Sequence, residues 1–169
     1  MLYAAYGSNL HPVRLSVRVP KARLLGSGVV TGWGLRFNKR GGDGSAKCNI
    51  AAARGRLHVA VYEMDPPDLS ALDEIEGAGF GYSRVRISVP DYGLCYTYIA
   101  TESHVDDSIH PYSWYKQLVL AGCEALGFPG PYIDIVRAVA AVSDPDRGRH
   151  ADNQAIVAAA KNNLKGGRI

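Results

Sequence analysis

The order of strand-like and helix-like patterns along the chain constrains its fold more than any single residue does. Up to residue 100, the chain carries mainly short apolar runs or apolar–polar alternation, in the segments 1–6, 22–30, 33–38, 48–53, 56–64, 82–90 and 94–100. Long helical patterns come mainly after residue 112. Strands that come mostly first, with helices inserted late, indicate an α+β protein rather than a doubly wound parallel sheet.

Helix signals are clearest in the middle of the chain. The acidic, proline-containing run 65–68 is typical of a helix start, and Gly77 is typical of a helix end. Within that helix Leu69, Leu72 and Ile75 recur at spacings of three, so we expect all of them to face the core. Further helices are expected near 12–17 and over 112–126, 132–142 and 151–164, and the end of the chain, 165–169, is expected to fray.

Length and composition favour one soluble domain. The chain has 169 residues, 47% of them hydrophobic and 21% charged, and no low-complexity linker divides it. We therefore expect a single domain over 1–169, in which about 144–169 forms a polar C-terminal extension. The net charge is +3 and the basic residues are scattered, which argues against a nucleic-acid partner. Dispersed cysteines, no signal peptide and no apolar run of membrane length predict a cytoplasmic protein without a membrane partner.

One segment, Tyr3–Leu10, has the features of a ligand-binding turn. An apolar strand stops at Gly7, Ser8 and Asn9, and the proline that follows suits the first turn of a helix. Glycine has no side chain, so a ligand can approach the backbone closely there. A concave set of backbone N–H groups from residues 7–10 suits an anion or a developing oxyanion. A plain strand-to-helix turn explains the same spacing, so the pattern alone leaves both interpretations open.

Two sequence blocks resemble signatures of the gamma-glutamyl cyclotransferase family, whose fold is also called AIG2-like. The run Tyr-Gly-Ser-Asn-Leu at 6–10 is similar to the family's first motif, directly after the first strand. The run Leu-Asp-Glu-Ile-Glu-Gly at 72–77 is similar to its acidic motif. Further pieces agree in order up to about Ser143. The resemblance implies a small mixed barrel-like sheet with flanking helices, and a site at one end of the barrel.

The resemblance also implies a reaction, the release of 5-oxoproline and a free amino acid or amine from a gamma-glutamyl substrate. This acyltransferase or lyase type of chemistry belongs to glutathione metabolism. The substrate's own α-amine would attack its γ-carbonyl, so the reaction requires no enzyme nucleophile, metal or cofactor. One carboxylate, Glu76, falls at the family's catalytic position and would take a proton from the α-ammonium and return one to the leaving nitrogen.

The position of Glu76 fits that role on physical grounds as well. It falls at the C-terminal end of the expected helix, where the macrodipole disfavours a negative charge, and this suits a group that must gain and lose a proton. For an arbitrary glutamate the ordinary alternative is a solvated helix-end acid. Glu74 is expected to be exposed.

Three tyrosines are candidates for substrate contacts. Tyr6 belongs to the first motif, and Tyr115 resembles the family's ligand-contacting tyrosine before the long helix. Tyr82 matches the tyrosine after the acidic motif, although the intervening loop 77–81 is one residue shorter than in the family. Ordinary half-buried packing is the alternative for Tyr82 and Tyr115.

Other kinds of site have weaker support from residue spacing. The histidines and cysteines form no metal-ligand pattern, and Ser8 lacks the Gly-x-Ser-x-Gly context of a serine nucleophile. The glycine-rich loop 40–45 misses the spacing of phosphate-binding loops and is expected to be mobile surface near the mouth of the site. The basic cluster 147–150 is expected to be solvated.

Two alternative functions stay open at this point. One is a non-catalytic binding module for a glutamate-like ligand on the same fold. The other is gamma-glutamyl removal from a larger amine in a biosynthetic pathway, which uses the same chemistry with another leaving group. A homodimer is also left open.

Overall fold

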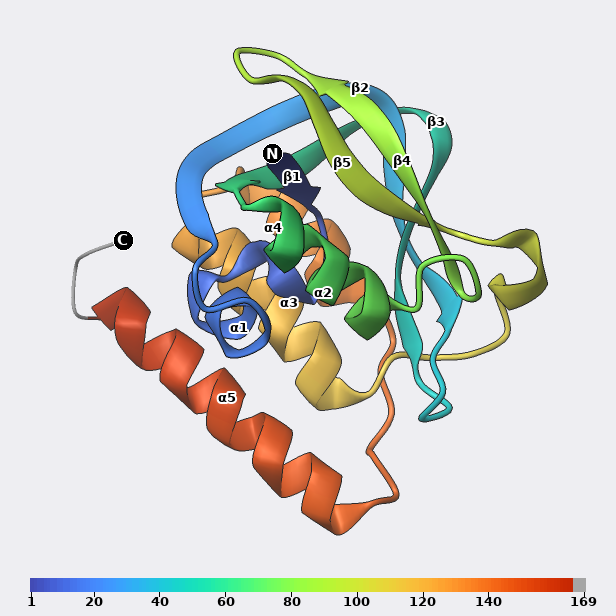
Figure 1. Ribbon diagram of the computed structural model, residues 1–169. Helices are drawn as coiled ribbons and strands as arrows, with labels where there is room; N and C mark the ends of the chain where they lie inside the picture. Colours follow the sequence, from blue (N-terminus) through green and yellow to red (C-terminus); the bar gives the residue numbers. More distant parts are fainter. Residues whose placement is uncertain (166–169) are drawn as a thin grey trace.

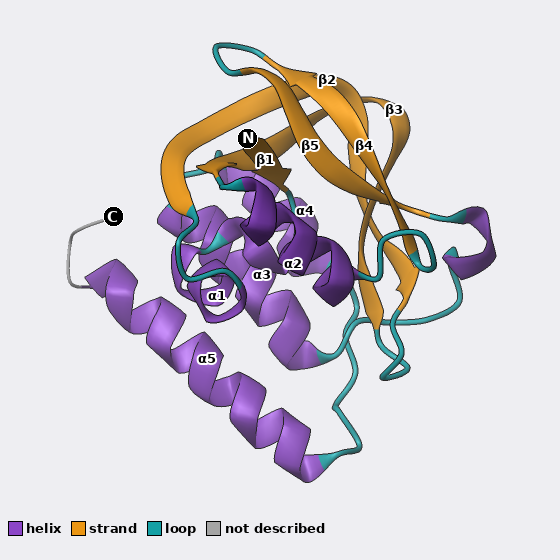
Figure 2. Cartoon of the chain, in the orientation of Figure 1, coloured by secondary structure: helices purple, strands orange, loops and turns teal. Residues whose placement is uncertain are grey.

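The computed structural model describes residues 1–165 and consists of a five-stranded sheet packed against a layer of helices (Figure 1). In spatial order the strands are β2 (Arg23–Arg40), β3 (Ala46–Glu63), β1 (Leu2–Ala5), β5 (Gly93–Ala100) and β4 (Tyr82–Val89). β1 runs parallel to β5, whereas the other neighbouring pairs are antiparallel. The helices gather on one side of this mixed sheet (Figure 2), which confirms the expected α+β class.

The helices occur in the predicted order, with shifted ends. They are α1 (Pro12–Arg18), α2 (Pro66–Glu76), α3 (Ser113–Ala125), α4 (Gly130–Ala138) and α5 (Arg147–Lys165), with short 3₁₀ helices η1 (Ser8–Leu10) and η2 (Glu102–His104). α4 begins earlier than expected because Pro131 fits its first turn. None of the described helices is long and apolar enough to cross a membrane. Residues 166–169 of the expected frayed end lie outside the described part of the chain.

The two longest strands form one curled hairpin. The sequence predicts four separate strands here, and this prediction is wrong, because β2 and β3 each continue across a glycine, Gly32 and Gly55 respectively. Gly32 has a φ of 85°, and the register of the ladder shifts between Thr31 and Trp33. Such an irregularity bends a strand and increases its twist without ending the pairing.

The curl gives the sheet its barrel-like shape. β2 and β4 are the two edges of the sheet, and they meet where Val89 packs on Gly28. A Cβ atom at Gly28 would lie only 2.5 Å from Val89 Cγ1, so a side chain there would push the edges apart.

The helix α2 carries the acidic motif and ends as predicted. Gly77 adopts a left-handed conformation with a φ of 66°, which glycine tolerates, so Glu76 is the last helical residue. Leu69 and Leu72 are buried, but Ile75 is 47% exposed, so the prediction of a buried Ile75 is wrong. Each step of three residues falls about 60° short of a full turn, and two such steps carry Ile75 off the buried face.

The last helix is attached to the fold by a buried carboxylate. Figure 1 shows α5 lying across α3 and α1. Asp144, just before α5, accepts hydrogen bonds from the Trp114 indole N–H (2.9 Å) and from two nitrogens of Arg149 (2.7 and 2.5 Å). The Arg149 guanidinium holds the pKa of the Asp144 carboxyl well below its usual range. The expectation of a solvated cluster is therefore wrong for Arg149.

Helix α3 forms the floor beneath η1, through a close contact at Gly122. A Cβ atom at Gly122 would lie 2.4 Å from Leu10 Cβ and 3.0 Å from the His11 nitrogen. The backbone of η1 therefore rests directly on α3.

We expect Gly122→Ala to lower the free energy of unfolding by about 1–3 kcal/mol, because overpacking must displace η1 or α3. Urea denaturation monitored by circular dichroism measures this change. Gly130→Ala is the matched control, because no atom lies within 4 Å of its added Cβ, and it should be close to neutral. Equal losses in both variants would contradict the close contact between η1 and α3.

Candidate active site

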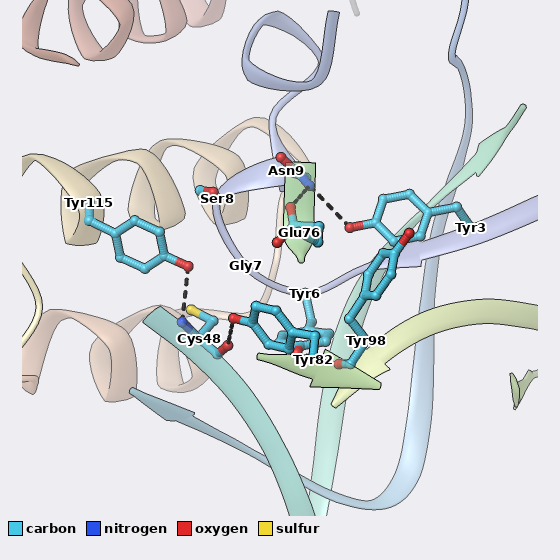
Figure 3. A pocket seen from close by; sticks show the side chains of 10 residues that line it. All are labelled: Tyr3, Tyr6, Gly7, Ser8, Asn9, Cys48, Glu76, Tyr82, Tyr98 and Tyr115. Carbon is cyan, nitrogen blue, oxygen red and sulfur yellow. Dashed lines mark hydrogen bonds between the residues drawn. The ribbon is translucent and has the colours of Figure 1, made fainter. Parts of the chain in front are cut away.

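A pocket opens where the end of β1, η1, the end of α2 and α3 come together (Figure 3). Side chains or backbone from ten residues line it: Tyr3, Tyr6, Gly7, Ser8, Asn9, Cys48, Glu76, Tyr82, Tyr98 and Tyr115. The structure thus brings the two sequence motifs to one place, although Asn9 and Glu76 are 67 positions apart in the sequence.

Of the three carboxylates in the acidic run, only Glu76 enters the pocket. Glu74 is exposed, as expected. Asp73 instead accepts a hydrogen bond from the Tyr98 hydroxyl (2.8 Å) and pairs with Arg84. The Glu76 side chain is 17% exposed, so it is sheltered but open to a ligand.

The carboxylate of Glu76 has two partners that sequence reasoning partly missed. Arg18 of α1 donates to Glu76 Oε1 at 2.6 Å, and the Asn9 side-chain amide donates to the same oxygen at 3.0 Å. Arg18 also donates to the side-chain oxygen Oδ1 of Asn9 at 3.2 Å, which closes a triangle of three side chains. Among the described residues all of these contacts fall on Oε1, so Oε2 stays available to a ligand.

The first motif serves this site through close packing and through Asn9. The φ of Gly7 is −112°, outside the left-handed region that favours glycine. The surrounding space requires glycine, because a Cβ atom added at Gly7 would lie 3.0 Å from Cys48 Cβ and 3.3 Å from the Tyr115 hydroxyl. Asn9 also donates to the Tyr3 hydroxyl at 3.2 Å, which orients its amide towards Glu76.

The predicted backbone donors are only partly available. The N–H groups of Ser8 and Asn9 have no acceptor among the described residues. The Leu10 N–H donates to the Gly7 carbonyl at 3.0 Å, and the Leu10 side chain is fully buried outside the pocket. The expectation that Leu10 lines the site is therefore wrong, because η1 uses its N–H to close the turn.

The three predicted tyrosines, Tyr6, Tyr82 and Tyr115, all line the pocket. Tyr6 donates to the Tyr98 carbonyl at 2.5 Å, and Tyr82 donates to the Cys48 carbonyl at 2.6 Å, despite the shortened loop before it. The Tyr115 hydroxyl instead accepts from the Cys48 N–H at 2.9 Å, so its own proton remains free to donate.

Burial keeps this tyrosine wall uncharged. Desolvation raises the pKa of Tyr6, Tyr82 and Tyr115 well above the usual tyrosine value, and nearby groups such as Cys48 raise it further. Burial likewise raises the pKa of the Cys48 thiol. Near neutral pH the wall therefore offers neutral hydroxyl groups around a single carboxylate.

Sequence reasoning missed Arg18, Tyr3, Tyr98 and Cys48. An arginine in the last turn of the helix after the first motif was a usable signal, because a basic residue there complements the helix end. No local pattern marks the others, because their place in the pocket comes from strand pairing between β1, β3 and β5.

The glycine-rich loop 40–45, expected to be mobile surface, is held by several hydrogen bonds and one ion pair. Gly41 and Gly44 bond within the turn, Asp43 pairs with Lys47 at 2.7 Å, and the Tyr112 hydroxyl donates to the Asp43 carbonyl at 2.8 Å. The loop borders the outer side of the Glu76 site, at the position predicted for it.

The sequence and the fold were compared with those of known proteins. A model of the AIG2-like family matches residues 56–136, a range that contains Glu76, Tyr82 and Tyr115. A solved structure of a gamma-glutamyl cyclotransferase superimposes with a TM-score of 0.82 at 23% identity, covering 94% of this chain and 98% of that one. The chain therefore has the gamma-glutamyl cyclotransferase fold.

Two curated relatives extend the similarity to sequence. Gamma-glutamylcyclotransferase of Homo sapiens is 27% identical over 149 residues, which cover 82% of this chain and 78% of the relative. The Mus musculus protein of the same name is 28% identical over the same length. These matches confirm the resemblance to the gamma-glutamyl cyclotransferase family that the two motifs indicate.

A double-mutant cycle tests the ion pair at the centre of this site. We expect Arg18→Met and Glu76→Gln to be coupled by about 1 kcal/mol in the free energy of unfolding, because the pair is sheltered and shares Asn9. The exposed pair Arg23–Glu63 is the control and should couple by less than about 0.5 kcal/mol, since its side chains are 67% and 51% exposed. No coupling between Arg18 and Glu76 would contradict the triangle described above.

Proposed function

We propose that this protein is a gamma-glutamyl cyclotransferase, which releases 5-oxoproline and an amine from a gamma-glutamyl compound. The observation that carries the proposal is the single carboxylate, Glu76, which shares a tyrosine-walled pocket with the backbone of residues 7–9. The curated relatives that bear this enzyme name support it.

In the proposed reaction the glutamyl group occupies the pocket and folds back on itself. Its α-ammonium lies near Glu76 Oε2, and its γ-carbonyl oxygen lies near the free N–H groups of Ser8 and Asn9. Holding amine and carbonyl within attack distance accounts for much of the rate, because intramolecular reactions gain most from orientation. The Tyr115 hydroxyl is a further donor for the oxygen on which negative charge develops.

Protons then pass from the α-ammonium to the leaving nitrogen by way of Glu76. Glu76 takes a proton from the α-ammonium, and the freed amine attacks the γ-carbonyl to form a carbon–nitrogen bond. The resulting tetrahedral intermediate collapses as the leaving nitrogen accepts the proton back from Glu76. The second α-ammonium proton reaches the released amine in the same way, so the products are the lactam 5-oxoproline and an ammonium ion. The substrate supplies the nucleophile, so this sequence needs no cofactor.

A binding module is the second candidate, and one observation favours it. Arg18 lies 2.6 Å from Glu76 and stabilises the charged carboxylate, which could hold a ligand ammonium without any proton transfer. A binding protein would hold the ligand without turnover, so an assay of 5-oxoproline release distinguishes it from an enzyme.

We expect Glu76→Gln to fold normally, to bind a gamma-glutamyl ligand and to lose about 100- to 10,000-fold in kcat, because an amide cannot take a proton from an ammonium. Glutamine keeps the size of glutamate, so the contacts with Arg18 and Asn9 persist in part. Chromatographic assay of 5-oxoproline gives kcat, and calorimetry gives ligand affinity.

Glu74→Gln is the matched control, because Glu74 belongs to the same acidic motif but is exposed on the helix. It should keep kcat within about twofold. Wild-type kcat in Glu76→Gln would rule out the acid–base role. Binding by the wild-type protein without 5-oxoproline release, across a panel of gamma-glutamyl compounds, would support the binding module.

A further inference from the structure

Helix α1, which carries Arg18 to the pocket, is capped by a histidine. His11 precedes the helix, and its Nδ1 atom accepts a hydrogen bond from the Val13 N–H at 3.1 Å. An imidazole nitrogen accepts only when it carries no proton, so this contact requires a neutral ring with its proton on Nε2. The side chains usually found at this position, those of serine, threonine, asparagine and aspartate, keep their acceptor atoms near neutral pH. The start of α1 therefore depends on a group that titrates close to neutral pH.

The His11 ring is enclosed by the helical layer. The residue is 2% exposed, its backbone lies beside Gly122 of α3, and α5 packs against both α1 and α3. The Nε2 atom is buried and has no hydrogen-bond partner among the described residues. A proton added to Nδ1 would meet the Val13 N–H, which is itself a donor. Protonation would therefore place a poorly compensated charge in the core.

The titratable side chains around His11 do not compensate for such a charge. Those that neighbour its contacts are Arg14 on α1, Cys123 and Glu124 on α3, and Lys161 on α5, whereas η1 has none. Glu124, the single carboxylate in this set, lies 3.7 Å from Arg137 in an ion pair. Burial raises the pKa of Cys123 to about 12, so its thiol stays neutral. Burial lowers the pKa of His11 from 6.5, and the backbone at Ala160 opposes this shift in part.

The cap affects the pocket because α1 is short. The helix has seven residues, and isolated helices shorter than about 12 residues are marginal in water. Its first turn is built on His11, whose carbonyl accepts from the Arg14 and Leu15 N–H groups at 3.0 and 3.1 Å. Its last residue is Arg18, which donates to Glu76 at 2.6 Å. In so short a helix, loss of the cap at one end displaces the arginine at the other.

We infer that His11 is a positioning residue, which holds Arg18 against Glu76 only while the imidazole ring is neutral. When the ring gains a proton, α1 loosens and the Glu76 carboxylate loses the partner that stabilises its charge. The pKa of His11 is lower in the folded protein than in the unfolded chain, so the unfolded chain binds more protons as the pH falls below 6.5. The contribution of the cap to stability is therefore complete above that pH and decreases below it. This inference concerns the assembly of the pocket and holds for an enzyme and for a binding module alike.

Nuclear magnetic resonance of the isotope-labelled protein, from about pH 7.5 down to about pH 5, tests this inference across the range in which histidine titrates. The imidazole signals report the protonation of His11, the Val13 amide reports the cap, and the Nε–Hε group of Arg18 reports the ion pair. We expect all three to change together, with one midpoint below pH 6.5. A ring that stays neutral throughout, or an Arg18 signal that does not change with it, would overturn the inference.

Two substitutions separate His11 from Glu76 as the source of the change. His11→Asn supplies a cap that does not titrate, so the Arg18 signal should keep its neutral-pH position as the pH falls. A transition that persists in this variant would belong to Glu76 and would overturn the inference. His11→Phe fills the space without an acceptor, so its Arg18 signal should already lie at the acidic position of the wild type at about pH 7.5.

His58→Gln is the matched control, because His58 is a half-buried histidine of β3 whose pKa burial also lowers. It should leave the transitions of His11 and Arg18 unchanged. Thermal unfolding identifies any variant that fails to fold, and the wild-type titration then decides the question without it.

Discussion

The site depends on the ion pair between Glu76 and Arg18. A carboxylate at the last residue of α2 faces the carbonyl end of its own helix, which disfavours its charge, and it is also largely withdrawn from water. Arg18 and Asn9 offset both effects with hydrogen bonds to one carboxylate oxygen. Three segments that are distant in sequence, η1, α1 and α2, are thereby held together at the point where the proposed chemistry takes place.

Contacts of η1 with α3 and of β1 with its neighbouring strands support that arrangement. η1 rests on α3 at Gly122, so the turn that carries Asn9 cannot move independently of the helical layer. Strand pairing of β1 with β3 and β5 brings neutral tyrosines around the carboxylate. A low-polarity wall with one charged pair strengthens electrostatic contacts with a bound ligand, because less water competes for them.

Much of the architecture was predictable from local patterns, whereas the site's contacts were predictable only in part. Alternation, helix caps and the two motifs are local signals, and they led to the α+β class, to the ends of α2 and to the choice of Glu76. The sequence predicts two strands separated at residues 31–32, because a bulge and a break look alike in sequence. Ile75 was misassigned because a spacing of three drifts around a helix. Arg18 could not be paired with Glu76 because their contact depends on how α1 and α2 pack.

In the proposed mechanism the substrate's own amine, and not water, attacks the γ-carbonyl. Turnover of gamma-glutamyl-alanine in H₂¹⁸O, followed by mass spectrometry, tests it most directly. We expect 5-oxoproline and alanine in equal amounts, with no ¹⁸O in either product. Formation of glutamate that carries ¹⁸O in its γ-carboxylate would show hydrolysis instead, and would contradict the mechanism built on Glu76.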